Sequence, residues 1–209
     1  MKPVVHVVDD DESFLRSVSR LLQAAGYAVR AYGSADEFAA RFDAETPGCV
    51  LTDLQMPGRS GLDLQEMVAN SANPLPVVFI TGRGDIPTSV RAMRGGAEDF
   101  LTKRSPKAAL MGAVARAIER DADDRASRDR RHAARTRLTS LTQREREVLA
   151  GVLRGQLNKQ IAKNLGLAER TVKFHRTAFT RKLGVSSAAQ LAILMCDAGL
   201  TTEDLGGGN

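Results

Sequence analysis

The chain has 209 residues, enough for two domains of ordinary size, and hydrophobic residues make up 43% of it. We expect neither a membrane protein nor an exported one, because no apolar run approaches the ~18 residues that span a bilayer and no opening segment resembles a signal peptide. Cys49 and Cys196 lie far apart and lack metal-ligand spacing, which indicates a reducing compartment. The expected location is therefore cytoplasmic.

The net charge of +5 is unevenly distributed along the chain. Residues 1–118 carry 13 Lys and Arg against 14 Asp and Glu, whereas residues 138–209 carry 10 against 6. All ten basic residues of the second part lie between Arg144 and Lys182. A near-neutral first part and a basic second part fit DNA binding by the second, although charge alone leaves an ordinary solvated surface equally open.

The first half alternates short runs of β-branched residues with amphipathic segments. We expect strands at Val4–Val8, Ala28–Tyr32, Cys49–Thr52, Pro76–Thr81 and Glu98–Thr102. We expect helices at Ser13–Ala25, Ser34–Phe42, Gly61–Ala69 and Ile86–Gly95. Nearly continuous apolar strands that alternate with helices predict a flavodoxin-like, doubly wound α/β fold, with a parallel five-stranded sheet in the order 2-1-3-4-5.

Acidic residues follow two strands that are neighbours in this order. Asp9 and Asp10 follow the first strand, Asp53 follows the third, and Lys103 follows the fifth. Because the carboxyl ends of parallel strands meet at one edge of the sheet, we expect a divalent cation there, with Asp53 as phosphoryl acceptor and Lys103 as counter-charge.

The expected cation is Mg²⁺, which prefers oxygen ligands and keeps several waters. We assign it to Asp10 and Asp53, with Asp9 bound directly or through water and the main-chain carbonyl of Gln55 as a further ligand. Asp11 is expected instead to begin the first helix, where a negative side chain favours the helix dipole.

Residues 119–137, ERDADDRASRDRRHAARTR, lie between the two parts and contain neither proline nor glycine. Their alanines and mixed charges predict a helix that continues the fifth helix of the first domain from about Ser105 and frays before Leu138. A flexible charged tether is the alternative. We thus divide the chain into a domain at 1–118, a linker at 119–137, a second domain at 138–200 and a tail at 201–209, which we expect to be disordered.

The second domain is predicted to be an all-α four-helix domain that contains a helix-turn-helix. Thr142 and Glu145 form a capping box at the start of its first helix. A second helix, a turn at Gly166–Ala168 and a third helix from about Glu169 follow, and the last helix is expected at Ala188–Asp197.

The third of these helices has the features of a recognition helix. Lys173 and Arg176 lie one turn apart near its start and are expected to read base edges, with Phe174 and Thr177 beside them. Contacts to DNA phosphates are expected from Asn158, Lys159, Thr171, Arg181 and Lys182. A basic surface helix without a DNA partner is the alternative reading.

The segments VHVVDDDES, LTDLQMPGRSGLDL, VVFITGRGD and RAMRGGAEDFLTK resemble the signature blocks of a two-component response-regulator receiver domain. The C-terminal half resembles a LuxR-type DNA-binding domain, and together the two halves resemble the FixJ/NarL group of response regulators. The resemblance implies a phosphorylated aspartate at Asp53, metal-binding acids at Asp9 and Asp10, a switch hydroxyl at Thr81, a switch aromatic ring at Phe100 and the receiver lysine at Lys103.

The same resemblance implies a set of partners. These are a sensor histidine kinase, double-stranded DNA at promoters, and a second copy of the chain after phosphorylation, with RNA polymerase as a further candidate. We expect no enzyme beyond slow self-dephosphorylation of Asp53. An aspartate-based, Mg²⁺-dependent phosphatase and a DNA-binding regulator that works without phosphorylation are the alternatives.

One residue departs from the pattern of the family. Proline usually follows the receiver lysine, in a cis peptide, whereas Arg104 follows it here. We expect a trans Lys103–Arg104 bond, because a cis bond to a non-proline residue costs about 3 to 4 kcal/mol. We further expect that Lys103 approaches Asp53 only after phosphorylation or metal binding.

Overall fold

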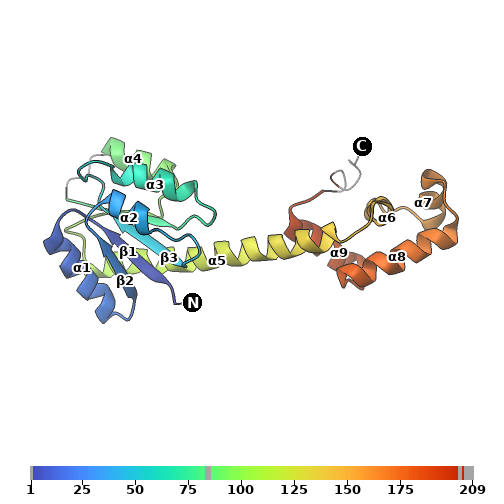
Figure 1. Ribbon diagram of the computed structural model, residues 1–209, viewed down its shortest axis with the longest axis horizontal. Helices are drawn as coiled ribbons and strands as arrows, with labels where there is room; N and C mark the ends of the chain where they lie inside the picture. The colour runs from blue at the N-terminus through green and yellow to red at the C-terminus, as the bar shows by residue number, and fades with distance from the viewer. Residues whose placement is uncertain (1, 83–85, 202–203, 205–209) are drawn as a thin grey trace. The chain divides into compact units, whose positions relative to one another are not determined.

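The computed structural model describes residues 2–82, 86–201 and 204, and the chain divides into two compact units between Arg125 and Ala126. Figure 1 shows the helices and strands of both units. Residues 83–85 of the GRGD segment, and residues 202–203 and 205–209 of the expected disordered tail, lie outside the described residues.

The first unit is a five-stranded parallel sheet in the order β2-β1-β3-β4-β5, which confirms the predicted fold. Its strands are β1 (Val4–Val8), β2 (Ala28–Tyr32), β3 (Gly48–Thr52), β4 (Val77–Thr81) and β5 (Asp99–Thr102). The connecting helices are α1 (Glu12–Ala24), α2 (Ala35–Arg41), α3 (Gly61–Ala69) and α4 (Ile86–Arg94), and α5 (Lys107–Thr139) follows β5.

Both faces of the sheet are covered, which explains the continuous apolar strands. Every residue of β1, β3 and β4 is buried. One core contains Leu22 of α1 and Val114 of α5, and the other contains Phe38 of α2 and Leu64 of α3. The helices thus form a layer on each face, as a doubly wound sheet requires.

The helix α5 runs without a break through residues 119–137, where we expected a helix rather than a flexible tether. It continues to Thr139, so the expected fraying before Leu138 is wrong. Its charged residues Asp121 and Arg125 dock on the amino-terminal edge of the sheet. The buried Asp121 carboxylate accepts a hydrogen bond from the Gly48 amide (2.8 Å) and contacts Arg125 Nε at 3.0 Å through both oxygens. Arg125 also donates to the carbonyl oxygens of Ala44, Glu45 and Thr46. The first compact unit therefore extends beyond residue 118.

The second unit contains α6 (Gln143–Leu153), α7 (Asn158–Leu165), α8 (Glu169–Leu183) and α9 (Ala188–Ala198). It also includes the end of α5, since Ala134 and Leu138 are buried in its core with Leu149 and Phe179. The helices α7 and α8 form the predicted helix-turn-helix, and Gly166 supplies the left-handed residue that ends α7. No helix in the described ranges is long and apolar enough to cross a membrane.

Candidate functional sites

Three carboxylates meet at the carboxyl edge of the sheet. Val8 of β1 pairs in register with Thr52 of β3, so the residues that follow these strands, Asp9 and Asp53, are neighbours. Their ligand oxygens and those of Asp10 lie within 4.8 Å of one another. Asp9 is fully buried and Asp53 is 7% exposed, whereas Asp10 is open to solvent. The structure thus brings together the three acids that the sequence predicted.

Lys103 completes this cluster. Its Nζ donates to Asp9 Oδ1 at 2.9 Å and lies 2.7 Å from Asp9 Oδ2 and 2.8 Å from Asp53 Oδ2. Burial acts against the ammonium, but the hydrogen bonds to Asp53 and Asp9 outweigh it and raise the pKa of Lys103. Burial raises the pKa of Asp9, and the contact with Lys103 counters part of this effect.

The loop after Lys103 corrects one expectation. No peptide bond of the described residues is cis, so the Lys103–Arg104 bond is trans as expected. The expectation that Lys103 stays away from Asp53 before phosphorylation or metal binding is wrong. The Lys103 amide donates to the Thr81 carbonyl (2.8 Å). The Thr102 amide donates to Ser105 Oγ (3.1 Å), and the Ser105 amide donates to the Thr102 carbonyl (2.9 Å). This hydrogen-bonded turn carries Lys103 to Asp53 without a proline.

The donor set of the cluster fits Mg²⁺. All three acids offer hard carboxylate oxygens, and the buried Asp9 Oδ2 is held by the Lys103 ammonium at 2.7 Å. The Gln55 amide donates to Asp53 Oδ1 at 3.3 Å, which places the main chain of this predicted ligand residue beside the acceptor. Asp9, Asp10 and Asp53 would hold the ion.

The two predicted switch residues lie on β4 and β5, the two strands beyond β3 in the sheet. Thr81 ends β4 and is buried, next to β3 in the sheet. Phe100 lies on β5 and is half-buried, with its ring centroid 6.0 Å from that of the buried Phe79. Their placement agrees with the pattern of the family, and their roles as switch residues stay predictions.

The exposed side of α8 carries the predicted base readers. Lys173, Phe174 and Thr177 are exposed, and 69% of the Phe174 surface is open to solvent. Arg176 is half-buried, and its Nη1 donates to Asn158 Oδ1 of α7 at 2.7 Å. This bond ties the second predicted reader to the helix before the turn, a contact that the sequence did not reveal.

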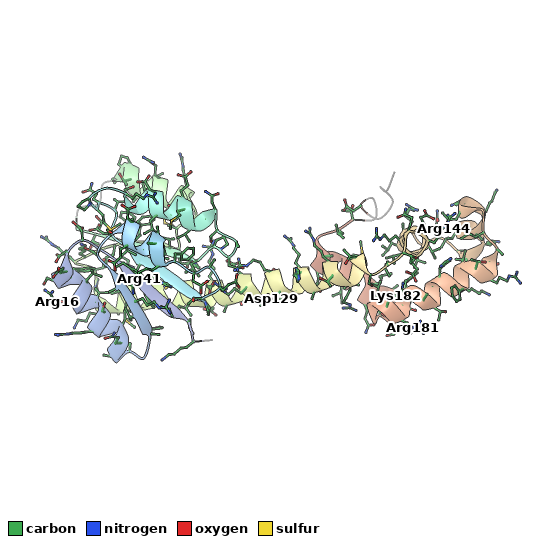
Figure 2. The ribbon with its side chains drawn as sticks, viewed as in Figure 1. Arg16, Arg41, Asp129, Arg144, Arg181 and Lys182 are labelled. Carbon is green, nitrogen blue, oxygen red and sulfur yellow. The ribbon has the colours of Figure 1, made fainter. Side chains whose placement is uncertain are left out.

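The residues predicted to contact phosphates differ in their surroundings. Lys159 and Arg181 are exposed, and Thr171 is half-buried. Lys182, labelled beside Arg181 on α8 in Figure 2, has its Nζ 2.7 Å from Oε2 of Glu145, a residue that is only 4% exposed. Burial acts against ionisation of Glu145, but hydrogen bonds with Lys182 and Thr142 outweigh it and lower the pKa of this carboxyl. The capping box in the sequence predicted that Glu145 caps α6, but no local signal predicted that Lys182 is its ion-pair partner.

Two known families match the chain, one within each compact unit. Residues 5–115 match the response regulator receiver domain, and residues 139–195 match the luxR family of bacterial regulatory proteins. The chain is a two-component response regulator with a LuxR-type DNA-binding domain. This confirms the predicted family, and it implies a histidine kinase as partner of the first domain and DNA as partner of the second.

Relatives resemble the chain over most of its length. The transcriptional regulatory protein FixJ of Azorhizobium caulinodans is 40% identical over 204 residues, covering 96% of this chain and 95% of FixJ. The response regulator protein TodT of Pseudomonas putida is 38% identical over 188 residues, covering 90% of this chain and 83% of TodT. The solved structure of the response regulator StyR is 43% identical, with a TM-score of 0.84, and the match covers 93% of this chain and 98% of StyR.

Proposed function

We propose that Mg²⁺-dependent phosphorylation of Asp53 by a partner histidine kinase controls dimerisation of this response regulator and transcription of its target genes. The observation that carries the proposal is the contact of the Asp53 carboxylate with Lys103 Nζ (2.8 Å) beside Asp9 and Asp10, on a chain that also carries a helix-turn-helix. The expected location of the protein is the cytoplasm.

The chemistry assigns a separate task to each side chain. Asp53, the acid that follows β3, attacks the phosphorus atom of the donor through one carboxylate oxygen, and the leaving group departs from the opposite side. When bound, Mg²⁺ neutralises charge on the transferring oxygens. The Lys103 ammonium, which lies beside Asp9 and Asp53, stabilises the negative charge of the transferring phosphoryl oxygens.

The proposed response starts at the phosphoryl group, whose charge of about −1.5 to −2 replaces the single negative charge of the Asp53 carboxylate. The Thr81 hydroxyl turns toward this group, and Phe100 moves inward against Phe79. The exposed apolar side chains of α4 then take part in pairing two receiver domains. These are Ile86 (80% exposed), Val90 (42%) and Met93 (48%).

A dimer presents two recognition helices to two half-sites of double-stranded DNA. Lys173 and Arg176 address base edges, with Phe174 and Thr177 beside them, and RNA polymerase is a candidate partner at the promoter. In this proposal the protein is not a dedicated enzyme, since it only accepts a phosphoryl group and slowly loses it. Sustained turnover of a phosphate ester would instead support the phosphatase alternative.

The phosphorylation step can be tested by intact-mass measurement. With Mg²⁺ and acetyl phosphate, the wild-type protein should gain one phosphate and Asp53→Asn should gain none. Asp10→Asn should require more Mg²⁺ for the same rate, because one hard oxygen ligand is lost. A phosphate adduct that persists in Asp53→Asn would contradict the assignment of the acceptor.

A further inference from the structure

The Lys103 ammonium has a third neighbour besides Asp9 and Asp53. The centroid of the Phe14 ring lies 4.6 Å from Lys103 Nζ, with the ammonium over the ring. A cation within about 6 Å of an aromatic centroid is attracted by the negative face of the ring. The ring is therefore a direct partner of the lysine.

The position of Phe14 is fixed by the start of α1. The Asp11 carboxylate caps the helix and accepts hydrogen bonds from the amides of Ser13 (2.9 Å) and Phe14 (3.1 Å). The ring then packs against the core that lies between the sheet and helices α1 and α5. The acid after the predicted metal ligands thus sets the place of the aromatic ring beside the lysine.

The aromatic contact also limits the space open to the lysine side chain. Phe14 and Lys103 line one hollow between α1 and α5, together with Val18, Leu21 and Leu110. The side chain of Lys103 is only 18% exposed. A long lysine side chain has several rotatable bonds, and such surroundings restrict the orientations that it can adopt.

The two carboxylate contacts of Lys103 involve atoms that the reaction requires. Asp53 supplies the oxygen that receives the phosphoryl group, and Asp9 supplies oxygens that fit the metal. When these oxygens take their new partners, Lys103 must redirect its hydrogen bonds. The Phe14 ring has no role as acceptor or ligand, so it can keep its contact with the ammonium throughout.

We infer that Phe14 is a positioning residue for phosphorylation, and that its ring holds the Lys103 ammonium beside the place where the phosphoryl oxygens arrive at Asp53. This inference rests on the proposed phosphorylation of Asp53. It assigns to Phe14 a contact with Lys103, not with the phosphodonor.

The kinetic test uses the full-length protein, acetyl phosphate and Mg²⁺, with intact mass as the readout. Phe14→Leu keeps an apolar side chain but removes the ring, so phosphorylation of Asp53 should slow by roughly three- to tenfold. Phe14→Tyr keeps the ring and should stay within about twofold of wild type. Phe42→Leu is the matched control, because Phe42 is also half-buried but packs on Phe38 (ring centroids 5.1 Å apart), away from Lys103.

A second readout does not depend on phosphorylation. In full-length, metal-free protein with ¹³C-labelled lysine, ¹³C relaxation reports the motion of the Lys103 Cε, whose signal is assigned by its loss in Lys103→Arg. Phe14→Leu should increase this motion, and Phe14→Tyr should restore it. If the wild type is not phosphorylated but Phe14→Leu still increases the motion, the proposed function fails and the contact of Phe14 with Lys103 stands.

Three results would overturn the inference. The first is an unchanged rate in Phe14→Leu. The second is a slower rate with unchanged Lys103 motion, since Phe14 would then act through another part of the protein. The third is equal slowing in Phe42→Leu, which would show a general effect of losing a half-buried ring.

Discussion

One buried histidine makes the stability of the receiver domain depend on pH. His6 lies in β1 with no exposed surface, and its Nδ1 is 3.0 Å from the Tyr32 hydroxyl. Its Nε2 has no hydrogen-bond partner among the described residues. Burial, helped by the charge of Arg30, lowers the pKa of His6 to about 4. The imidazole is therefore neutral in the folded protein at physiological pH.

We predict that His6 makes the first unit less stable in acid. The unfolded histidine takes up a proton near pH 6.5, whereas the folded one resists until about pH 4. Stability from this group is complete above pH 6.5 and falls as the pH drops toward 4, by about 2 kcal/mol between pH 7 and 4.5. His6→Gln, which cannot titrate, should lack this part of the decline.

The measurement is urea unfolding followed by tyrosine fluorescence. It reports on the first unit alone, because the two tyrosines of the chain, Tyr27 and Tyr32, both lie there. Other titrating groups are shared by wild type and variant, so their effects cancel in the comparison. An identical pH dependence in both proteins would show that His6 contributes nothing.

The recognition helix leads to a second prediction at the residue scale. Lys173 is exposed, and its ion pair with Glu169 is long (3.8 Å) and open to solvent, so its ammonium is available to DNA. Arg176 lies one turn further along α8. Replacing either by alanine should cost roughly 1 to 3 kcal/mol on a preferred site and little on random DNA. Lys163→Ala, which removes the same charge from α7, should weaken both kinds of binding slightly. Equal losses on both DNAs for Arg176→Ala would show that the assumed orientation of α8 is wrong.

At the scale of helices and strands, local signals were enough to predict most elements. The caps Asp11, Ser34 and Thr142 accept hydrogen bonds from the first turns of their helices, and such bonds involve residues two or three positions apart. Pairs between distant residues could not be predicted in this way. Asp121 and Arg125 read as ordinary charged positions of a solvated helix, yet both anchor α5 to the sheet.

The anchor of α5 gives a prediction for stability. Arg125→Ala should destabilise the first unit by about 3 kcal/mol, because it leaves the buried Asp121 carboxylate without its counter-ion. Arg120→Ala is the control, since Arg120 is 48% exposed and its pair with Glu98 should contribute less than about 1 kcal/mol. Urea unfolding by tyrosine fluorescence measures both. Equal costs for the two variants would contradict a structural role for the anchor.

The pair between α6 and α8 gives the corresponding prediction for the second unit. Lys182→Ala should destabilise this unit by about 1 to 3 kcal/mol, since the buried Glu145 loses the ammonium that lies 2.7 Å from its Oε2. Amide hydrogen exchange of α6 and α8 would show the loss as faster exchange. The neighbouring exposed Arg181 offers a control, and if Arg181→Ala accelerates exchange equally, the pair with Glu145 is not the cause.

At the scale of the whole molecule, one helix belongs to two cores. Val114 and Ala117 of α5 are buried in the first unit, and Ala134 and Leu138 are buried in the second. Composition and charge predicted two domains and a helical link, but placed the start of the second at residue 138. The end of α5 reads as a solvated segment because arginines surround Ala134, although Arg135 Nε donates to the Ala198 carbonyl at the end of α9 (3.0 Å).

The central claim, that phosphorylation of Asp53 controls DNA binding, can be tested by one affinity measurement. A site is first selected from random duplex DNA with the phosphorylated wild-type protein. Fluorescence anisotropy then gives the Kd of the full-length protein for that site, with and without acetyl phosphate and Mg²⁺. We predict that phosphorylation tightens binding by about tenfold or more in the wild type and has no effect in Asp53→Asn. Equal affinity of the phosphorylated and unphosphorylated wild type would contradict the account.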